Sequence, residues 1–264
     1  MTSDYGNLEL HQILLSAMQD FHNFCEANNL RYCLHGGTCL GAIRHQGFIP
    51  WDDDVDIAMP RKDYDRFLKL APKTLGNKYT VLTYKNDKSM ITNVTKIKIH
   101  TPGKEWSGDT YPFLDIFPMS DVPNSKWLQR LQNKLAIFVN TIVYTRIGYV
   151  HLNSFKAKLV YGSLSKLGRR FWSGVLEHLV IKHFPHFRSK SVNIVATANY
   201  CNNTGYSTDL WPKYFFENRL LTPFEGEMFY ITQHWEEYLT EMYGDYMTPP
   251  AENARSNKHG IEKG

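Results

Sequence analysis

A short acidic stretch, residues 52–56 with the sequence Asp-Asp-Asp-Val-Asp, follows a glycine pair at Gly36 and Gly37. Carboxylates crowded this closely raise one another's pKa or hold a cation. Two glycines between a strand and a helix allow the backbone and the free N–H groups of the helix to approach a phosphate. The two features together predict phosphoryl chemistry assisted by a divalent metal.

Asp54 and Asp56 are the expected metal ligands of this stretch. If they lie on a strand, residues two apart project from one face, so that both carboxylates converge on one point. Mg²⁺ takes one or two carboxylates together with phosphate oxygens and water. Asp115, between apolar neighbours on a second expected strand, is the third candidate ligand. The alternatives are a solvated acidic turn and an EF-hand calcium loop, although Ile57 stands where that loop requires glycine.

The glycine turn is followed by residues that can hold a phosphate. Gly36 and Gly37 lead into the helix expected from Thr38, and Arg44 and His45 follow one to two turns later, where they can neutralise phosphate charge. Surface charge is the alternative role for both basic residues. The turn is not a P-loop, because no Gly-Lys-Ser/Thr follows it.

Apolar periodicity predicts the elements that position these residues. We expect helices at 8–29, 38–43 and 62–70, and strands at 30–35, 55–59, 79–84, 94–100 and 111–118. Further helices are expected within 126–190 and around 192–200 and 232–243. The predicted class is α+β: a mixed sheet flanked by helices, with a basic helical insertion and a helical C-terminal segment.

Composition places few limits on function. The chain has 264 residues, of which 42% are hydrophobic and 21% charged, as in ordinary globular proteins. The four cysteines are scattered and follow no secretory signal, so we expect structural thiols in a reducing compartment. No apolar run approaches the length of about 20 residues that spans a bilayer.

Residues 126–190 differ from the rest of the chain. They hold twelve Lys or Arg and one acid, Glu177, so this segment carries +11 and the remainder −7 of the total +4. Such a segment is either a solvated helix face or a surface for an anionic partner: membrane headgroups, a polyanionic polymer or nucleic acid. Aromatic residues interleave with the basic ones, and because no known nucleic-acid module is visible, a lipid or lipid-linked surface is favoured over RNA. His178, His183 and His186 do not share one helix face, which disfavours zinc.

Three motifs resemble the LicD family of phosphotransferases, which includes the fukutin-related proteins. They are LHGGTCLGAIRHQGFIPWDDDVDIAMPRKDYDRF at 34–67, FLDIFP at 113–118 and YGDYMTPP at 243–250. The resemblance implies a nucleotidyltransferase-like core at 1–125, which the C-terminal segment 191–264 completes, and leaves 126–190 unexplained. It also implies transfer of phosphocholine, or a similar phospho-alcohol, from a CDP-linked donor to a sugar hydroxyl of a surface glycan.

The resemblance assigns roles to the same residues. Mg²⁺ or Mn²⁺ is expected on Asp54, Asp56 and Asp115, with Asp115 as general base. The remaining expected substrate-binding residues carry charge near the donor or orient it: Arg44, Asp52, Asp53, Lys96 and Lys98. Aromatic residues that can cage choline, or else belong to the core, are Trp211, Tyr214, Phe215 and Phe216.

Two other functions share these features. One is a nucleotidyltransferase that acts on a small acceptor, and the other is a non-catalytic protein associated with a membrane. The expected partners are a CDP-alcohol donor, CDP-choline first, a free or lipid-linked glycan acceptor and an anionic membrane, without nucleic acid. The expected location is the cytoplasm, at the inner face of the membrane.

Overall fold

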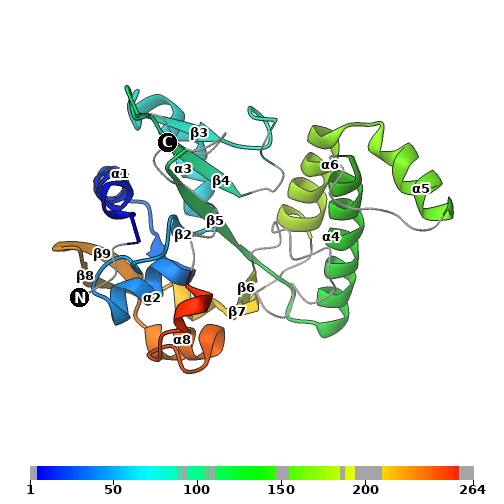
Figure 1. The fold of residues 1–264 in the computed structure, drawn as a ribbon. Helices are drawn as coiled ribbons and strands as arrows, with labels where there is room; N and C mark the ends of the chain where they lie inside the picture. Colours follow the sequence, from blue (N-terminus) through cyan, green and yellow to red (C-terminus); the bar gives the residue numbers. More distant parts are fainter. Residues whose placement is uncertain are drawn as a thin grey trace. The chain divides into compact units, whose positions relative to one another are not determined.

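A computed structural model describes residues 5–88, 90, 94–104, 106, 111–146, 155–184, 188–193 and 210–255 (Figure 1). The helices are α1 (Leu8–Ala27), α2 (Gly36–Arg44), α3 (Arg61–Thr74), α4 (Lys126–Arg146), α5 (Phe155–Ser165), α6 (Arg169–Val175), a π-helix (Leu176–Lys182), α8 (Trp235–Tyr243) and 3₁₀ turns at Lys213–Phe216 and Glu252–Ala254. The strands are β1 (Cys33–Leu34), β2 (Val55–Pro60), β3 (Tyr79–Leu82), β4 (Thr95–Ile99), β5 (Phe113–Asp121), β6 (Ser191–Asn193), β7 (Leu210–Pro212), β8 (Arg219–Phe224) and β9 (Glu227–Thr232).

The chain forms two compact units that interleave in sequence. The first holds residues 1–81, 96–118 and 215–264, and the second holds 82–95 and 119–214. We describe each unit by itself. The predicted division at residues 125 and 190 stays a prediction.

The first unit contains a sheet in the order β1-β2-β5-β4-β3. Strand β1 runs antiparallel to β2, with Leu34 opposite Ile57, so the glycine turn after β1 and the start of β2 lie together. Helix α3 contacts β2, and the apolar faces predicted for α1 and α3 meet: the Phe21 ring of α1 lies 5.7 Å from that of Phe67 in α3 and 5.2 Å from that of Tyr32, which precedes β1. The predicted α+β class, a mixed sheet flanked by helices, is confirmed.

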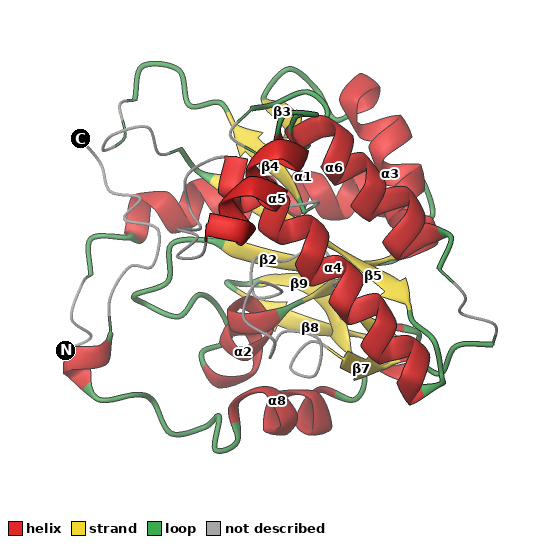
Figure 2. Ribbon diagram, turned by 90° about the vertical axis from the view of Figure 1, so that its right-hand side faces the viewer, coloured by secondary structure: helices red, strands yellow, loops and turns green. Residues whose placement is uncertain are grey.

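The second unit is built around α4, which packs against α5, α6 and the π-helix (Figure 2). Its core consists of Val122, Ala136, Val139, Leu176, Val180 and Ile181. The end of β5 pairs with β6, which pairs with β7, both antiparallel. No helix among the described residues combines the length and the apolar composition that crossing a membrane requires.

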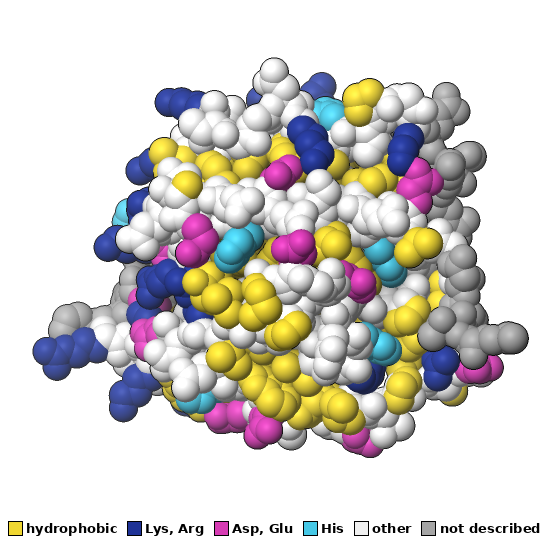
Figure 3. Space-filling view, turned by 90° about the vertical axis from the view of Figure 1, so that its left-hand side faces the viewer, with side chains coloured by type: hydrophobic (Ala, Val, Ile, Leu, Met, Phe, Trp, Pro, Cys, Tyr) yellow, Lys and Arg dark blue, Asp and Glu magenta, His cyan; other side chains and the backbone are white. Residues whose placement is uncertain are grey.

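Most predicted elements are present, but the C-terminal segment is not helical throughout. Residues 191–193 form β6 where a helix was expected, and 194–200 lie outside the described residues. The hairpin of β8 and β9 was not predicted, although Glu225 and Gly226 at its turn have φ of 50° and 81°, the conformation of a type I′ turn. Figure 3 shows the face that carries α1, α2 and this hairpin, where apolar side chains mix with acidic and histidine side chains.

Candidate active site

Asp52, Asp53 and Asp54 form a compact carboxylate cluster in the loop before β2. One oxygen from each lies within 4.8 Å of the others, and all three residues are buried. The main-chain carbonyl of Asp52 fixes the loop to α1, because it accepts hydrogen bonds from Asn7 Nδ2 at 3.3 Å and His11 Nε2 at 2.7 Å. Burial lowers the pKa of His11, which favours the neutral form of its ring.

The glycine turn makes room for two of the carboxylates. A Cβ on Gly36 would lie 2.9 Å from Asp56 Oδ2, and a Cβ on Gly37 would lie 2.8 Å from Asp52 Oδ2. Gly36 also has φ of +51°, in the left-handed region that favours glycine. Any side chain at either position would therefore displace an acid of the candidate site.

Thr38 and His35 join the turn to β2 through the backbone of Asp56. The N–H of Asp56 donates to Thr38 Oγ1 at 2.9 Å, and its carbonyl accepts from the N–H of His35 at 2.9 Å. Helix α2 begins at Gly36, two residues before the predicted start. The main chain thus holds Gly36, Gly37, Thr38 and Asp56 in one arrangement.

Tyr238, a buried residue of α8 near the C-terminus, forms hydrogen bonds with two residues of the glycine turn. The N–H of Gly36 donates to Tyr238 Oη at 2.9 Å, so the hydroxyl is left to donate to His35 Nδ1, 2.7 Å away. Burial lowers the pKa of His35 to about 4, which keeps this nitrogen available as an acceptor. Tyr243 Oη also borders the turn, since a Cβ on Gly36 would lie 3.8 Å from it, and desolvation of the phenol, followed by the charge of Asp56, raises its pKa.

Asp115 lies on β5 and is held by Lys96 of β4. Lys96 Nζ lies 2.9 Å from each carboxylate oxygen of Asp115 and 3.3 Å from the centroid of the Phe113 ring. Lys98, two residues along the same strand, lies over Tyr111, with Nζ 4.3 Å from the ring centroid.

The predicted metal ligands differ from the carboxylates that gather most closely. In the described part of the chain, the group of three carboxylates with oxygens within 4.8 Å of one another is Asp52, Asp53 and Asp54. The assignment of metal to Asp54, Asp56 and Asp115 stays a prediction.

Arg44, at the end of α2, connects the site to the segment that follows α8. Its Nη1 donates to the carbonyl of Tyr246 at 2.9 Å, and its Nε to His45 Nε2 at 3.0 Å. The guanidinium of Arg255 lies 4.9 Å from the ring centroid of Trp51, next to the acidic loop. Helices α2 and α8 are in contact (Figure 1).

Several contributors to the site were not predicted: Asn7, His11 and Tyr238. Sequence spacing carries little sign of them, because each acts through a backbone group remote in sequence. Of the four aromatic residues considered for a choline cage, Phe215 and Phe216 pack around Tyr238 and Trp211 is buried in the other unit, while Tyr214 is 38% exposed. The core role is therefore the one observed for three of them.

Three scattered cysteines, Cys25, Cys33 and Cys39, are buried free thiols whose pKa is raised by burial, as expected of core residues. Cys201 lies outside the described residues. His183 Nδ1 is 2.6 Å from the carbonyl of His178, and His186 lies outside the described residues.

The motifs at the site agree with comparisons to known proteins. Residues 29–158 match the family described as "LicD/FKTN/FKRP, nucleotidyltransferase domain". The chain is 30% identical over 261 residues, 95% of each protein, to the lipopolysaccharide cholinephosphotransferase LicD of Haemophilus influenzae. It is 42% identical over 52 residues, 20% of this chain and 10% of the relative, to the human ribitol 5-phosphate transferase FKRP. The chain belongs to the LicD family.

Proposed function

We propose that this protein transfers a phospho-alcohol, with phosphocholine as the first candidate, from a CDP-linked donor to a sugar hydroxyl of a lipopolysaccharide-type glycan. The observation that carries the proposal is the buried cluster of Asp52, Asp53 and Asp54 against the glycine turn, in a chain aligned over 95% of its length with a cholinephosphotransferase. The similarity to a ribitol 5-phosphate transferase supports the general class and leaves the alcohol to be identified.

The acids at the site fit a hard divalent cation. They supply only carboxylate oxygens, which suit Mg²⁺ or Mn²⁺ and not a thiolate-binding metal. Asp54 is common to the observed cluster and to the expected set with Asp56 and Asp115, so it is the ligand in which we place most weight. When bound, such an ion supplies positive charge that offsets the charge of a diphosphate.

The residues of the chain have complementary roles in the proposed transfer. The ion pair with Lys96 stabilises Asp115 as a carboxylate, the form that accepts the proton of the attacking sugar hydroxyl. The sugar oxygen bonds to the phosphorus of the phospho-alcohol as the bond to the bridging oxygen breaks and CMP leaves. Arg44 and Lys98 supply positive charge for the departing CMP phosphate.

The test measures CMP release with each CDP-alcohol (choline, ethanolamine, glycerol and ribitol) in Mg²⁺, with lipopolysaccharide as acceptor. We expect one donor to give CMP and a glycan that carries the phospho-alcohol. The Asp54→Asn variant should lose this activity by at least about a hundredfold, on the scale of a lost electrostatic contact in a transition state.

The matched control is Asp20→Asn, the same chemical change at an exposed acid of α1 that pairs with Lys78. It should retain the activity of the wild type. Release of diphosphate with nucleotide on the acceptor would replace the proposal by nucleotidyl transfer. Full activity of Asp54→Asn would refute the role of the cluster.

A further inference from the structure

The first three turns of α4 expose two parallel rows of side chains. Trp127, Leu131 and Leu135 are 67%, 36% and 38% exposed and recur every four residues. The residue before each of them is an exposed Lys or Arg, at 126, 130 and 134. The rows extend for about 13 Å along the helix at 1.5 Å per residue. Side chains four apart lie one above the other, so a basic row runs beside an apolar row.

The opposite face of α4 is fixed in the second unit. Gln129 Nε2 donates to the carbonyl of Pro123, and Gln132 Nε2 to that of Val180, both at 2.7 Å within the interior. One turn further, Ala136 belongs to the hydrophobic core. Because these contacts set the rotation of the helix about its axis, the two rows are held outward.

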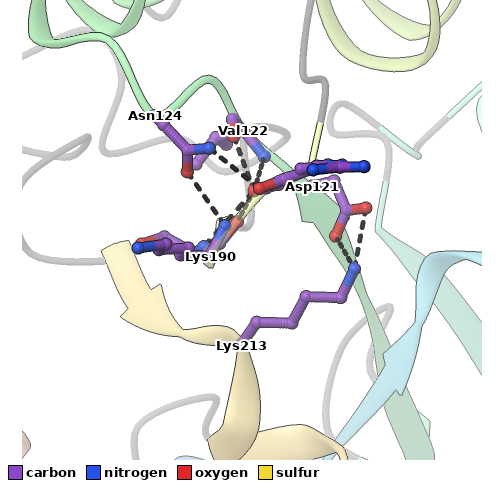
Figure 4. Close-up of polar contacts among 8 residues, drawn as sticks. Asp121, Val122, Asn124, Lys190 and Lys213 are labelled. Carbon is purple, nitrogen blue, oxygen red and sulfur yellow. Dashed lines mark hydrogen bonds and ion pairs between the residues drawn. The ribbon is translucent and has the colours of Figure 1, made fainter.

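The start of α4 is also anchored, as Figure 4 shows. Lys213 Nζ lies 2.9 Å from both carboxylate oxygens of Asp121, at the end of β5. The Asn124 side chain accepts from the N–H of Lys190 at 2.9 Å and donates to the carbonyl of Arg188 at 2.8 Å. Helix α4 begins two residues after Asn124, so these contacts hold the segment from which the helix starts.

The rows have the chemistry of a lipid headgroup boundary. Trp is enriched at that boundary, leucines insert into it, and Lys and Arg keep their charge among anionic headgroups while their stems cover apolar surface. None of the three basic side chains forms an ion pair with another described residue. A nucleic acid would match the basic row and could stack a base on Trp127, but it would gain little from Leu131 and Leu135, because leucine side chains offer no face for base stacking.

We propose that this face of α4, residues 126–135, docks the protein on an anionic membrane surface. The docking is peripheral: the apolar row enters the headgroup region and the basic row contacts lipid phosphates. The same basic–apolar pairing recurs at Lys166–Leu167 and Arg170–Phe171, all four exposed, within the same unit. The segment that gives the chain its charge asymmetry thus has a specific role that does not depend on the proposed chemistry.

The experiment is co-sedimentation of the full chain with vesicles of phosphatidylcholine alone or mixed with phosphatidylglycerol, at low and high salt, without donor or acceptor. We expect binding to the mixed vesicles that weakens as salt rises. Changing Lys126, Arg130 and Lys134 together to Gln should reduce partitioning by on the order of a hundredfold, at roughly fivefold per basic side chain. Changing Trp127, Leu131 and Leu135 to Ser should abolish binding even at low salt.

Two matched controls carry the same chemical changes elsewhere. Lys62, Lys69 and Lys73 are exposed on α3, and their change to Gln alters the net charge equally. Leu220, Leu221 and Met228 are exposed on the β8–β9 hairpin, and their change to Ser removes comparable apolar surface. Both controls should bind as the wild type does, and circular dichroism should show all four variants folded.

Three results would overturn the proposal. The first is equal loss of binding in the α3 control, which would mean that overall charge and not this face is responsible. The second is unchanged binding in both α4 variants. The third is binding to single-stranded RNA, or self-association through the same face, without binding to vesicles. Because transfer is measured separately in solution, the vesicle experiment can fail while the proposed activity stands.

Discussion

Replacing Tyr238 by Phe tests whether α8 positions the glycine turn. The hydroxyl of Tyr238, whose side chain is 1% exposed, accepts from the N–H of Gly36 at 2.9 Å and donates to His35 Nδ1 at 2.7 Å. The Phe variant keeps the ring and its packing but leaves a buried N–H and a buried ring nitrogen without this partner. Two net hydrogen bonds and the desolvation of the orphaned groups amount to about 2–4 kcal/mol of unfolding free energy.

The chain supplies a matched control in Tyr32, which is also 1% exposed. Its hydroxyl lies 2.8 Å from His22 Nδ1 and forms a hydrogen bond with the backbone of Tyr230. Tyr32→Phe therefore removes the same kinds of bond and should cost a similar free energy of unfolding. Only Tyr238→Phe removes the hydrogen bond to Gly36, the residue whose φ of +51° places the turn against Asp56.

The two variants separate stability from positioning. Urea unfolding should show that both variants lose a similar free energy of unfolding. In thermal melts, each kcal/mol lost should lower Tm by about 2–4 °C. Phosphocholine transfer at a temperature where both are folded should fall by about 10–100-fold in kcat for Tyr238→Phe alone, the scale expected when reacting groups shift by about 1 Å. Equal activity in the two variants would refute a positioning role for Tyr238 and leave it as a core residue.

Other perturbations of the same unit have defined outcomes. Gly37→Ala should lose transfer activity with a small change in Tm, because its Cβ would displace the Asp52 carboxylate; a Mg²⁺-dependent thermal shift that matches the wild type would contradict this. Because the pKa of His35 is about 4 in the fold and about 6.5 unfolded, the unfolded chain binds the extra proton between these values. The unfolding free energy should therefore fall by about 3 kcal/mol as pH drops through that window, and urea midpoints should show a shallower slope for His35→Asn. Lys96→Met leaves Asp115 without its cation, so kcat should fall more than KM rises, and a pH–rate profile unchanged on the acid side would exclude Asp115 as the base.

In the acidic stretch, strand alternation can place only those carboxylates that lie on the strand itself. The prediction that Asp54 and Asp56 share one face of a strand requires both to lie on the strand. Strand β2 begins at Val55, so alternation governs Asp56, whereas Asp54 belongs to the preceding loop and gathers with Asp52 and Asp53. The predicted strand, 55–59, begins at the same residue as β2, so Asp54 lay outside the predicted strand as well and alternation could not place its side chain. The shared metal site of Asp54 and Asp56 stays a prediction.

Long amphipathic helices were predictable because one face of each meets a core. The end of α1 fell within two residues of its expected position, while β6 and the β8–β9 hairpin were missed. Strand β6 has three residues, too few for any pattern, and both faces of β8 are partly exposed, including Leu220 and Leu221, so no alternation marks it. The turn at Glu225 and Gly226 was the available signal, since a Gly with positive φ commonly closes a hairpin.

The glycine pair illustrates what a sequence does not contain. Two glycines after a strand were interpreted as an approach for phosphate, yet their missing side chains also leave the space that Asp52 and Asp56 occupy. The partner that fixes the turn, Tyr238, lies 202 residues from Gly36. Local patterns select residues that can do chemistry, but the hydrogen bond that holds Gly36 forms only when the first unit is folded. If Tyr238→Phe lowers transfer as expected, a change in α8 will have acted on acids that lie in a loop far away in sequence.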